Sequence, residues 1–265
     1  MFRNRFIGPG SLSLIAFVAI GLAVELPAAS AQTAPRSPAD TLIQFYKLMR
    51  ERHYREAFAI SIYRPAVDGL TQQEFEDLQS DFDKMAAGIP EKIEVTGEQV
   101  DGDVATVMVK IPNDDPAKVS IEPAILIRAG DAWIVGDENG QAAVKKAGKR
   151  FFLDARIDTH QREVEDLLKR LLTVEALYSS QHGGSFGNLA AVISAGLMPQ
   201  DLSGTESTGY HFHINVARDG KSYTAGAEPA RYGHSGKLSY WMDQAGTTKS
   251  ADNKGQPLPG STKSN

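Results

Sequence analysis

Apolar residues in the stretch 37–87 recur at intervals of three and four, which is the spacing of one face of an α-helix. One stripe runs from Leu42 to Met49 and predicts an amphipathic helix whose other face is polar. A second, shorter helix is predicted over residues 54–62, and a third starts at the Thr-Gln-Gln-Glu capping pattern of Thr71. We therefore expect three helices before the period changes.

Between residues 93 and 135 the apolar positions alternate with polar ones, which is typical of half-buried β-strands. Turn-forming pairs of Asp and Gly, at residues 101–102 and 130–131, interrupt the alternation. Two hairpins in succession make a four-stranded antiparallel meander, and the preceding helices then pack on one face of a curved, cone-like sheet. The pattern predicts an α+β domain over residues 37–138.

The longest periodic segment begins after Asp154 and keeps apolar residues on one stripe as far as Tyr178, before Gly183-Gly184 ends it. A short helix is predicted from Asn188. Three strand patterns follow, over residues 210–216, 222–227 and 238–242. The second half is therefore expected to be a long helix packed on a small antiparallel sheet, which makes a second α+β domain over residues 154–250.

Segments of a different composition join and follow the two predicted domains. Residues 139–153 are mostly polar and predict an inter-domain linker. Four of them are basic: Lys145, Lys146, Lys149 and Arg150. Residues 251–265 hold Gly, Pro, Ser and Lys with one bulky apolar residue, and this composition predicts a disordered tail.

Residues 1–31 have the pattern of a cleaved secretory signal. Arg3 and Arg5 supply a positive start, residues 12–24 are almost all apolar, and the small residues at positions 29–31 fit a signal-peptidase site. The apolar run is shorter than the roughly 20 residues that a membrane-spanning helix needs, although an uncleaved anchor is the alternative. We expect an exported protein, periplasmic or extracellular, without a membrane span after cleavage.

Composition and charge exclude several classes of protein. The chain has 28 basic and 33 acidic residues and a formal net charge of −5, which excludes a basic nucleic-acid binder. It has no Cys, so disulfides and thiolate chemistry are excluded as well. A hydrophobic share of 42% is that of ordinary globular domains rather than of a disordered chain.

The order of elements in the first half agrees with one known superfamily. Three predicted helices precede two hairpins, and the closing hairpin, residues 125–135, has a hydrophobic strand, a Gly-Asp turn and then Trp133 with an aliphatic pair. This order resembles the nuclear-transport-factor-2-like superfamily, the cystatin-like cone, especially its small exported lumazine-binding-like members. Such a resemblance implies an isomerase, a dehydratase, a ligand-binding module or an assembly module, so it does not select a function.

Motifs in the second half agree in order and spacing with another family. Their positions are residues 173–178, 183–189, 195–197, 207–212 and 238–243. The arrangement resembles the soluble head of type IV pilins and type II secretion pseudopilins. In that family the matching segments are the end of a long helix, the helix-to-sheet connection, a glycine-aromatic entry into the first strand, and the closing strand. A filament-forming pilin also has an apolar stalk, and none precedes Asp154. The resemblance therefore implies a head that docks on partners, with components of a secretion or pilus machinery as the expected ones.

Four aromatic residues of the first half would line a pocket for a small apolar ligand. They are Tyr46, Tyr54, Tyr63 and Trp133. Aromatic residues at helical or strand spacing more often fill a core than bind a ligand, and that alternative stays open. The acidic residues of this half lie at alternating strand positions or in turns, where a solvated face explains them. No catalytic residue is predicted.

His211 and His213 are the candidates for a metal site. Their spacing on a predicted strand places both imidazoles on the same face of the sheet. Imidazoles bind zinc or copper, but a stable site needs a third ligand, and a polar outer face of the sheet explains the pair equally well. The sequence predicts no cofactor.

Taken together, the patterns predict an exported, non-enzymatic binding or assembly accessory protein of the bacterial cell envelope. The alternative is a small-molecule carrier or enzyme that uses the cavity of the cone-like domain. The interior of that domain separates the two hypotheses. If large aromatic side chains fill it, the accessory role is favoured, and the candidates for filling it are Phe45, Phe58, Phe82 and Trp133.

Overall fold

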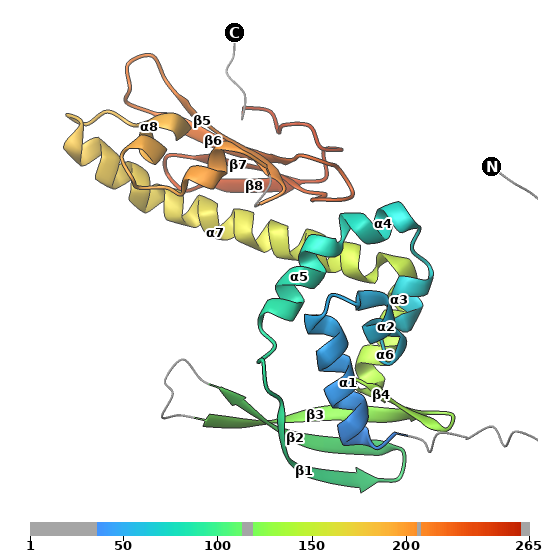
Figure 1. Cartoon of the computed structure of the whole chain (residues 1–265). Coiled ribbons are helices and arrows are strands. Elements are labelled where there is room, and N and C mark those ends of the chain that lie inside the picture. The colour runs from blue at the N-terminus through green and yellow to red at the C-terminus, as the bar shows by residue number, and fades with distance from the viewer. Residues whose placement is uncertain (1–35, 113–118, 206–207, 261–265) are drawn as a thin grey trace, which may run out of the picture. The chain divides into compact units, whose positions relative to one another are not determined.

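The computed structural model describes residues 36–112, 119–205 and 208–260. These residues form a mixed α+β structure, with helices, two four-stranded antiparallel sheets and one long helix (Figure 1). The predicted fold class is therefore confirmed. The predicted secretory signal of residues 1–31 lies outside the described residues. Within the described ranges, no helix combines the length and the apolar character that crossing a membrane requires.

Within residues 36–93 of the described chain, five helices precede the first sheet. They are α1 (Pro38–Arg50), α2 (Tyr54–Ala59), α3 (Arg64–Asp68), α4 (Gln72–Asp77) and α5 (Gln79–Ala87). The Ser37 side chain caps α1, and Thr71 and Glu74 form the predicted capping box of α4. The predicted third helix is divided at Leu78, whose side chain is almost fully buried and anchors the junction of α4 and α5.

The first sheet is the predicted meander. Its strands are β1 (Glu94–Asp101), β2 (Val104–Pro112), β3 (Val119–Ala129) and β4 (Ala132–Val135), hydrogen-bonded in the order β1-β2-β3-β4. Helix α1 contacts all four strands (Figure 1). Leu42 of α1 packs with Val107, Leu126 and Trp133 of the sheet. The alternation in the sequence therefore identifies the face of the sheet that α1 covers.

Residues 139–153, predicted as a linker, are helical throughout most of their length. They form α6 (Glu138–Ala147), a short 3-10 helix η1 (Gly148–Arg150), and the start of α7 (Phe151–Gln181). The Asp137 side chain caps α6, and Val144 and Phe152 are buried in the same core as Phe58 and Phe82. Two buried apolar residues are enough to fix this segment, although its many charged residues hide them in the composition.

The sequence predicted that the long helix starts after Asp154. Helix α7 begins three residues before Asp154, at Phe151. Its first turns belong to the aromatic core of the first half, where the ring centroids of Phe152 and Phe82 are 5.0 Å apart. Its later turns place Leu168 and Leu171 in the core of the second sheet. One continuous helix therefore contributes to both cores.

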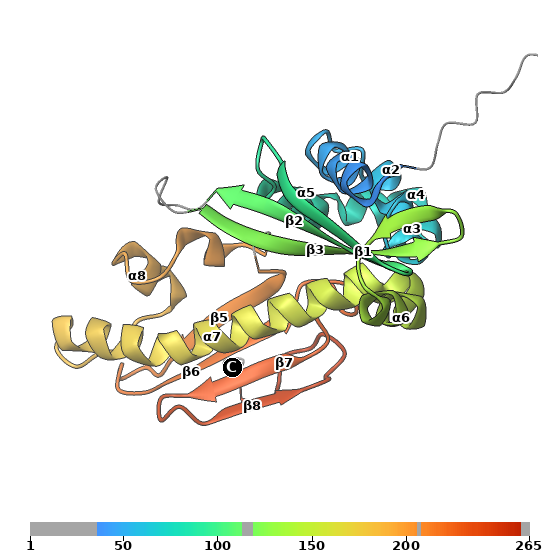
Figure 2. The same ribbon diagram turned by 90° about the horizontal axis from the view of Figure 1, so that it is seen from below.

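The second sheet is hydrogen-bonded in the order β5-β6-β7-β8 and lies along α7 (Figure 2). The elements after α7 are α8 (Leu189–Ser194), η2 (Gln200–Ser203), β5 (Tyr210–Val216), β6 (Tyr223–Pro229), β7 (Ser239–Asp243) and β8 (Thr248–Ala251). The long helix packed on a small antiparallel sheet is thus confirmed, with three predicted strands and a fourth that the sequence pattern did not reveal.

The predicted disordered tail is ordered as far as the structure describes it. Ala251 ends β8, which pairs with β7, and Leu258 is 9% exposed. The Thr224 hydroxyl donates a hydrogen bond of 3.2 Å to the carbonyl of Gly260. Because strand pairing uses backbone groups, a polar sequence can be ordered without a visible apolar pattern. Residues 261–265 lie outside the described ranges.

Candidate binding cleft

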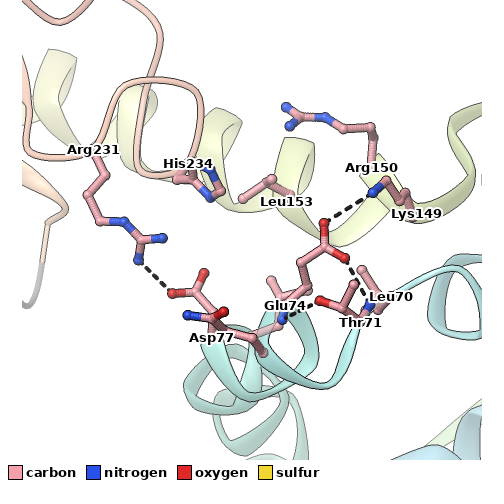
Figure 3. A pocket seen from close by; sticks show the side chains of 11 residues that line it. Leu70, Thr71, Glu74, Asp77, Lys149, Arg150, Leu153, Arg231 and His234 are labelled. Carbon is pink, nitrogen blue, oxygen red and sulfur yellow. Dashed lines mark hydrogen bonds and ion pairs between the residues drawn. The ribbon is translucent and has the colours of Figure 1, made fainter.

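A cleft of about 620 Å³ opens where α4, the start of α7 and the loop of residues 230–237 approach one another (Figure 3). This volume is within the range of small-ligand sites. Charged and apolar side chains both line it. The lining residues are Leu70, Thr71, Gln73, Glu74, Asp77, Leu78, Lys149, Arg150, Leu153, Arg231 and His234.

Glu74 is held by the first turn of α4. The Thr71 backbone N–H donates to Glu74 Oε2 at 2.9 Å, and Lys149 Nζ donates to Oε1 at 3.1 Å (Figure 3). The hydrogen bond from the Thr71 backbone, followed by the Lys149 contact, lowers the pKa of Glu74 below its ordinary value. Glu74 is therefore an ionised, oriented carboxylate at neutral pH.

Asp77 lies at the end of α4 between two arginines. Arg231 Nη1 is 2.6 Å from Asp77 Oδ1, and Arg156 Nη1 is 2.8 Å from Oδ2. Burial by itself raises the pKa of Asp77, but the hydrogen bonds and charges of Arg231 and Arg156 outweigh it and hold the pKa below its ordinary value. Arg156 also pairs with Asp81, so its guanidinium joins α7 to both α4 and α5.

The loop that carries Arg231 and His234 is anchored to α7. His160 Nδ1 lies 2.9 Å from the carbonyl oxygen of Ser235, and the Arg231 N–H donates to Ser235 Oγ at 3.0 Å. Gly209, beside this loop, has a φ of +68°, and a Cβ there would lie only 2.6 Å from His160 Nδ1. Glycine permits this close approach, which fixes the loop against the helix.

Arg150 completes the cationic side of the cleft. Its Nη2 donates to Asp154 Oδ1 at 2.7 Å, and its Nη1 donates to the carbonyl of Gly233 at 3.5 Å. The lining residues thus include three fixed positive charges and two fixed negative charges, 3 − 2 = +1 with His234 neutral. Leu70, Leu78 and Leu153 supply the apolar part of the lining.

The aromatic residues named from the sequence do not line this cleft. Tyr54 and Trp133 are 2% and 6% exposed, in two different cores, and Tyr63 packs on the rings of Phe151 and Phe152. Tyr54 donates its hydroxyl to Asp83, and burial followed by this hydrogen bond raises the pKa of Tyr54 to about 12. Tyr46 is half-buried beside both cores. The four residues are thus not brought together at one site.

His211 and His213 share one face of β5, as predicted. His213 Nδ1 lies 3.5 Å from Glu228 Oε2 on the neighbouring strand, and burial raises the pKa of Glu228 to about 7. His211 is exposed. Over the part of the chain that the structure describes, no three His, Cys, Asp or Glu side chains gather in a metal-binding arrangement.

Sequence reasoning found parts of the cleft but not the cleft itself. Thr71 and Glu74 were recognised as a helix cap, and Lys149 and Arg150 as part of a basic cluster. No sequence pattern identified Arg231 as a cleft residue, because it lies in a loop some 150 residues away from Asp77 along the chain. A pairing over that separation has no local pattern.

Comparisons with known proteins add little to this description. No family model matches the chain, and no curated protein matches it in sequence. One solved structure, described as an NTF2-like transpeptidase from Campylobacter jejuni, aligns with 38% of this chain and 97% of its own, at 13% identity and a TM-score of 0.27. A TM-score this low establishes neither a shared fold nor a shared activity. The pilin-like resemblance of the second half has no support among these comparisons.

Proposed function

We propose that this protein is a non-enzymatic, exported binding or assembly accessory of the cell envelope, and that the cleft is its binding surface. The observation that carries the proposal is the state of the two carboxylates in the cleft. Glu74 and Asp77 are both paired with cations, and both have a lowered pKa. A general base or acid that works near neutral pH needs a pKa near that pH, so the lowered pKa values of Glu74 and Asp77 favour binding over acid–base catalysis by these two residues.

The interior of the first half supports the same choice. Phe58 and Phe82 are fully buried with ring centroids 5.0 Å apart, and Phe45 and Trp133 are 8% and 6% exposed. The first three side chains pack in one hydrophobic core with Phe152, and Trp133 packs in a second core against the sheet, and this close packing supports the accessory role over a carrier or enzyme with a cavity inside the cone. We therefore favour the cleft at α4 over the interior of the first half as the binding site for a partner.

The location and the partners are proposed from the sequence. Export rests on the signal pattern of residues 1–31, and components of a secretion or pilus machinery follow from the pilin-like motifs of the second half. The cone-like resemblance of the first half allows an assembly role. The cleft adds the residues through which such a partner would be contacted.

A crosslinking experiment tests this proposal. A photo-reactive amino acid is placed at Gln73, which lines the cleft, or at the control position Gln99, an exposed glutamine on β1. Illumination of envelope fractions should give a discrete adduct from Gln73 that is missing from Gln99, and mass spectrometry then identifies its partner. The absence of an adduct at Gln73, or the same adducts from both positions, would count against the cleft as the binding surface.

A further inference from the structure

We infer that the cleft selects a polypeptide carboxylate that has an apolar side chain next to it. This inference deepens the proposed function and rests on the cleft being the binding surface. It follows from three properties of the lining residues, which are their hydrogen-bond donors, their net charge and their apolar part.

The acceptor oxygens of the cleft acids already have partners. Glu74 Oε1 accepts from Lys149 and Oε2 from the Thr71 backbone, while Asp77 Oδ1 accepts from Arg231 and Oδ2 from Arg156. A ligand that offers hydrogen-bond donors would have to compete with these contacts. The carboxylates therefore position the cations and do not attract a cationic ligand.

The cations keep donors to spare. A guanidinium has five N–H groups, and among the described residues the Arg231 side chain uses only Nη1, on Asp77. Lys149 donates one of its three N–H groups to Glu74, which leaves two for other acceptors. The two side chains are 58% and 53% exposed, and Figure 3 draws them at opposite sides of the cleft with His234 and Leu153 between them. An acceptor-rich anion can therefore reach unused donors from both sides.

The charges around the cleft favour an anion with few negative charges. Three cations and two paired carboxylates line the cleft, and Asp154, which pairs with Arg150, adds a further carboxylate beside it. A phosphate, with close to two charges, would leave an excess of negative charge beside Glu74 and Asp77. Planar carboxylates also match the fork of the Arg231 guanidinium.

The apolar part of the lining is the reason to expect an apolar side chain next to the carboxylate of the ligand. Leu70, Leu78 and Leu153 come from α4 and α7 and reach the same cleft as the cations. A side chain such as leucine, adjacent to the carboxylate, would be removed from water on these residues. A small inorganic anion cannot use this part of the cleft.

The test is a calorimetric titration of the full protein with three blocked peptides and one ion. The peptides are N-acetyl-leucyl-leucine as the free acid, the same peptide as the C-terminal amide, and an amide that carries an internal glutamate. Inorganic phosphate is the fourth probe. We expect the free acid or the glutamate peptide to bind at least about tenfold more tightly than the plain amide, with weaker binding as salt is raised. The preferred peptide tells a chain terminus from an acidic side chain.

Variants connect the binding to the cleft. Arg231→Gln and Lys149→Gln should each weaken binding of the preferred peptide several-fold. Arg64→Gln is the matched control, because Arg64 also forms an exposed arginine–aspartate pair, with Asp68 at 3.1 Å, but does not line the cleft. Lys149→Gln removes only an exposed contact, so it reports on binding even if Arg231→Gln unfolds.

The outcomes separate this inference from the proposed function. Equal affinity for acid and amide, tighter binding of phosphate, or unchanged binding by both cleft variants overturns the inference. If Gln73 still yields its specific adduct in that case, the proposed function stands with a different ligand chemistry. If Gln73 yields no adduct, the proposed function fails whatever the peptides show.

Discussion

Glu74 and Asp77 in the cleft and Glu175 and Glu228 in the second half are the same chemical groups in opposite surroundings. The cleft acids each have two hydrogen-bonding partners that include cations, and their pKa values are lowered. Glu175 on α7 is fully buried, and its Oε2 accepts a bond of 2.9 Å from the Gly187 backbone N–H. Burial raises the pKa values of Glu175 and Glu228 to about 7.

The difference teaches how the two regions respond to pH. A carboxylate with a lowered pKa stabilises the folded protein above its ordinary pKa, and this contribution is lost as the pH falls through the lowered value. A carboxyl group with a raised pKa contributes stability that is fully present below its unfolded value, 4.5 for Glu175, and is lost as the pH rises through about 7. Acid therefore weakens the ion pairs around the cleft, whereas a rise in pH from about 4.5 to about 7 weakens the second half.

The largest expected effect is that of Arg156→Gln. The Arg156 side chain is only 10% exposed and lies between Asp77 and Asp81. Its loss leaves the half-buried Asp81 without this cation and leaves Asp77 with Arg231 alone. We expect about 3 kcal/mol less free energy of unfolding at neutral pH, measured by urea denaturation, and a smaller loss in acid. Arg64→Gln, which breaks an exposed pair, should cost less than about 1 kcal/mol. Similar losses for both variants would mean that Arg156 is no more than a surface contact.

A smaller effect on stability is expected from Glu175→Gln, which removes one of the two carboxyl groups with a raised pKa. Ionising a buried carboxyl with a pKa near 7 rather than 4.5 costs the wild type up to about 3 kcal/mol as the pH rises. The variant cannot ionise, so its stability relative to the wild type should rise by about 1 to 3 kcal/mol between roughly pH 5 and pH 8. Urea denaturation across this range measures the change.

Glu228→Gln serves as the companion to Glu175→Gln. The Glu228 side chain is 16% exposed, so the same change with pH should appear at a smaller size. If the free energy of unfolding changes with pH in the same way for the wild type and both variants, neither carboxyl group titrates between roughly pH 5 and pH 8. The cleft and the second half would then not differ in their response to pH.

The smallest effect on stability is expected from Lys149→Gln. The side chains of Lys149 and Glu74 are 53% and 38% exposed, and exposed ion pairs contribute little to the free energy of unfolding. The free energy of unfolding should hardly change, while binding of the carboxylate peptide drops. Circular dichroism melts beside the calorimetric titration measure both quantities. A large loss of stability would instead make Lys149 a structural residue.

Local patterns in the sequence predicted the elements well where each element buries a regular stripe. The stripe from Leu42 to Met49 became α1, and the alternation on both sides of Gly130 became β3 and β4. These predictions succeed because the period of the apolar residues is the period of the backbone itself. The capping box at Thr71 succeeded for a similar reason, since its partners are three residues apart.

The failures occur where few residues or only backbone groups hold a segment. Residues 139–153 are helical because Val144 and Phe152 reach the aromatic core, yet charged residues dominate the composition there. The described end of the predicted tail is held by the pairing of β8 with β7 and by Leu258. Backbone pairing leaves no trace in the side-chain pattern.

The sequence by itself determined the fold class, the helix start at Thr71 and the first meander, because these depend on neighbours within a few residues. Only the tertiary structure decided the cleft. Asp77, Lys149 and Arg231 come from three distant stretches of the chain, and nothing local relates them until α7 and the loop after β6 bring them to α4. The pKa values of the acids were decided there as well, because desolvation and pairing depend on what folding places around each carboxyl group.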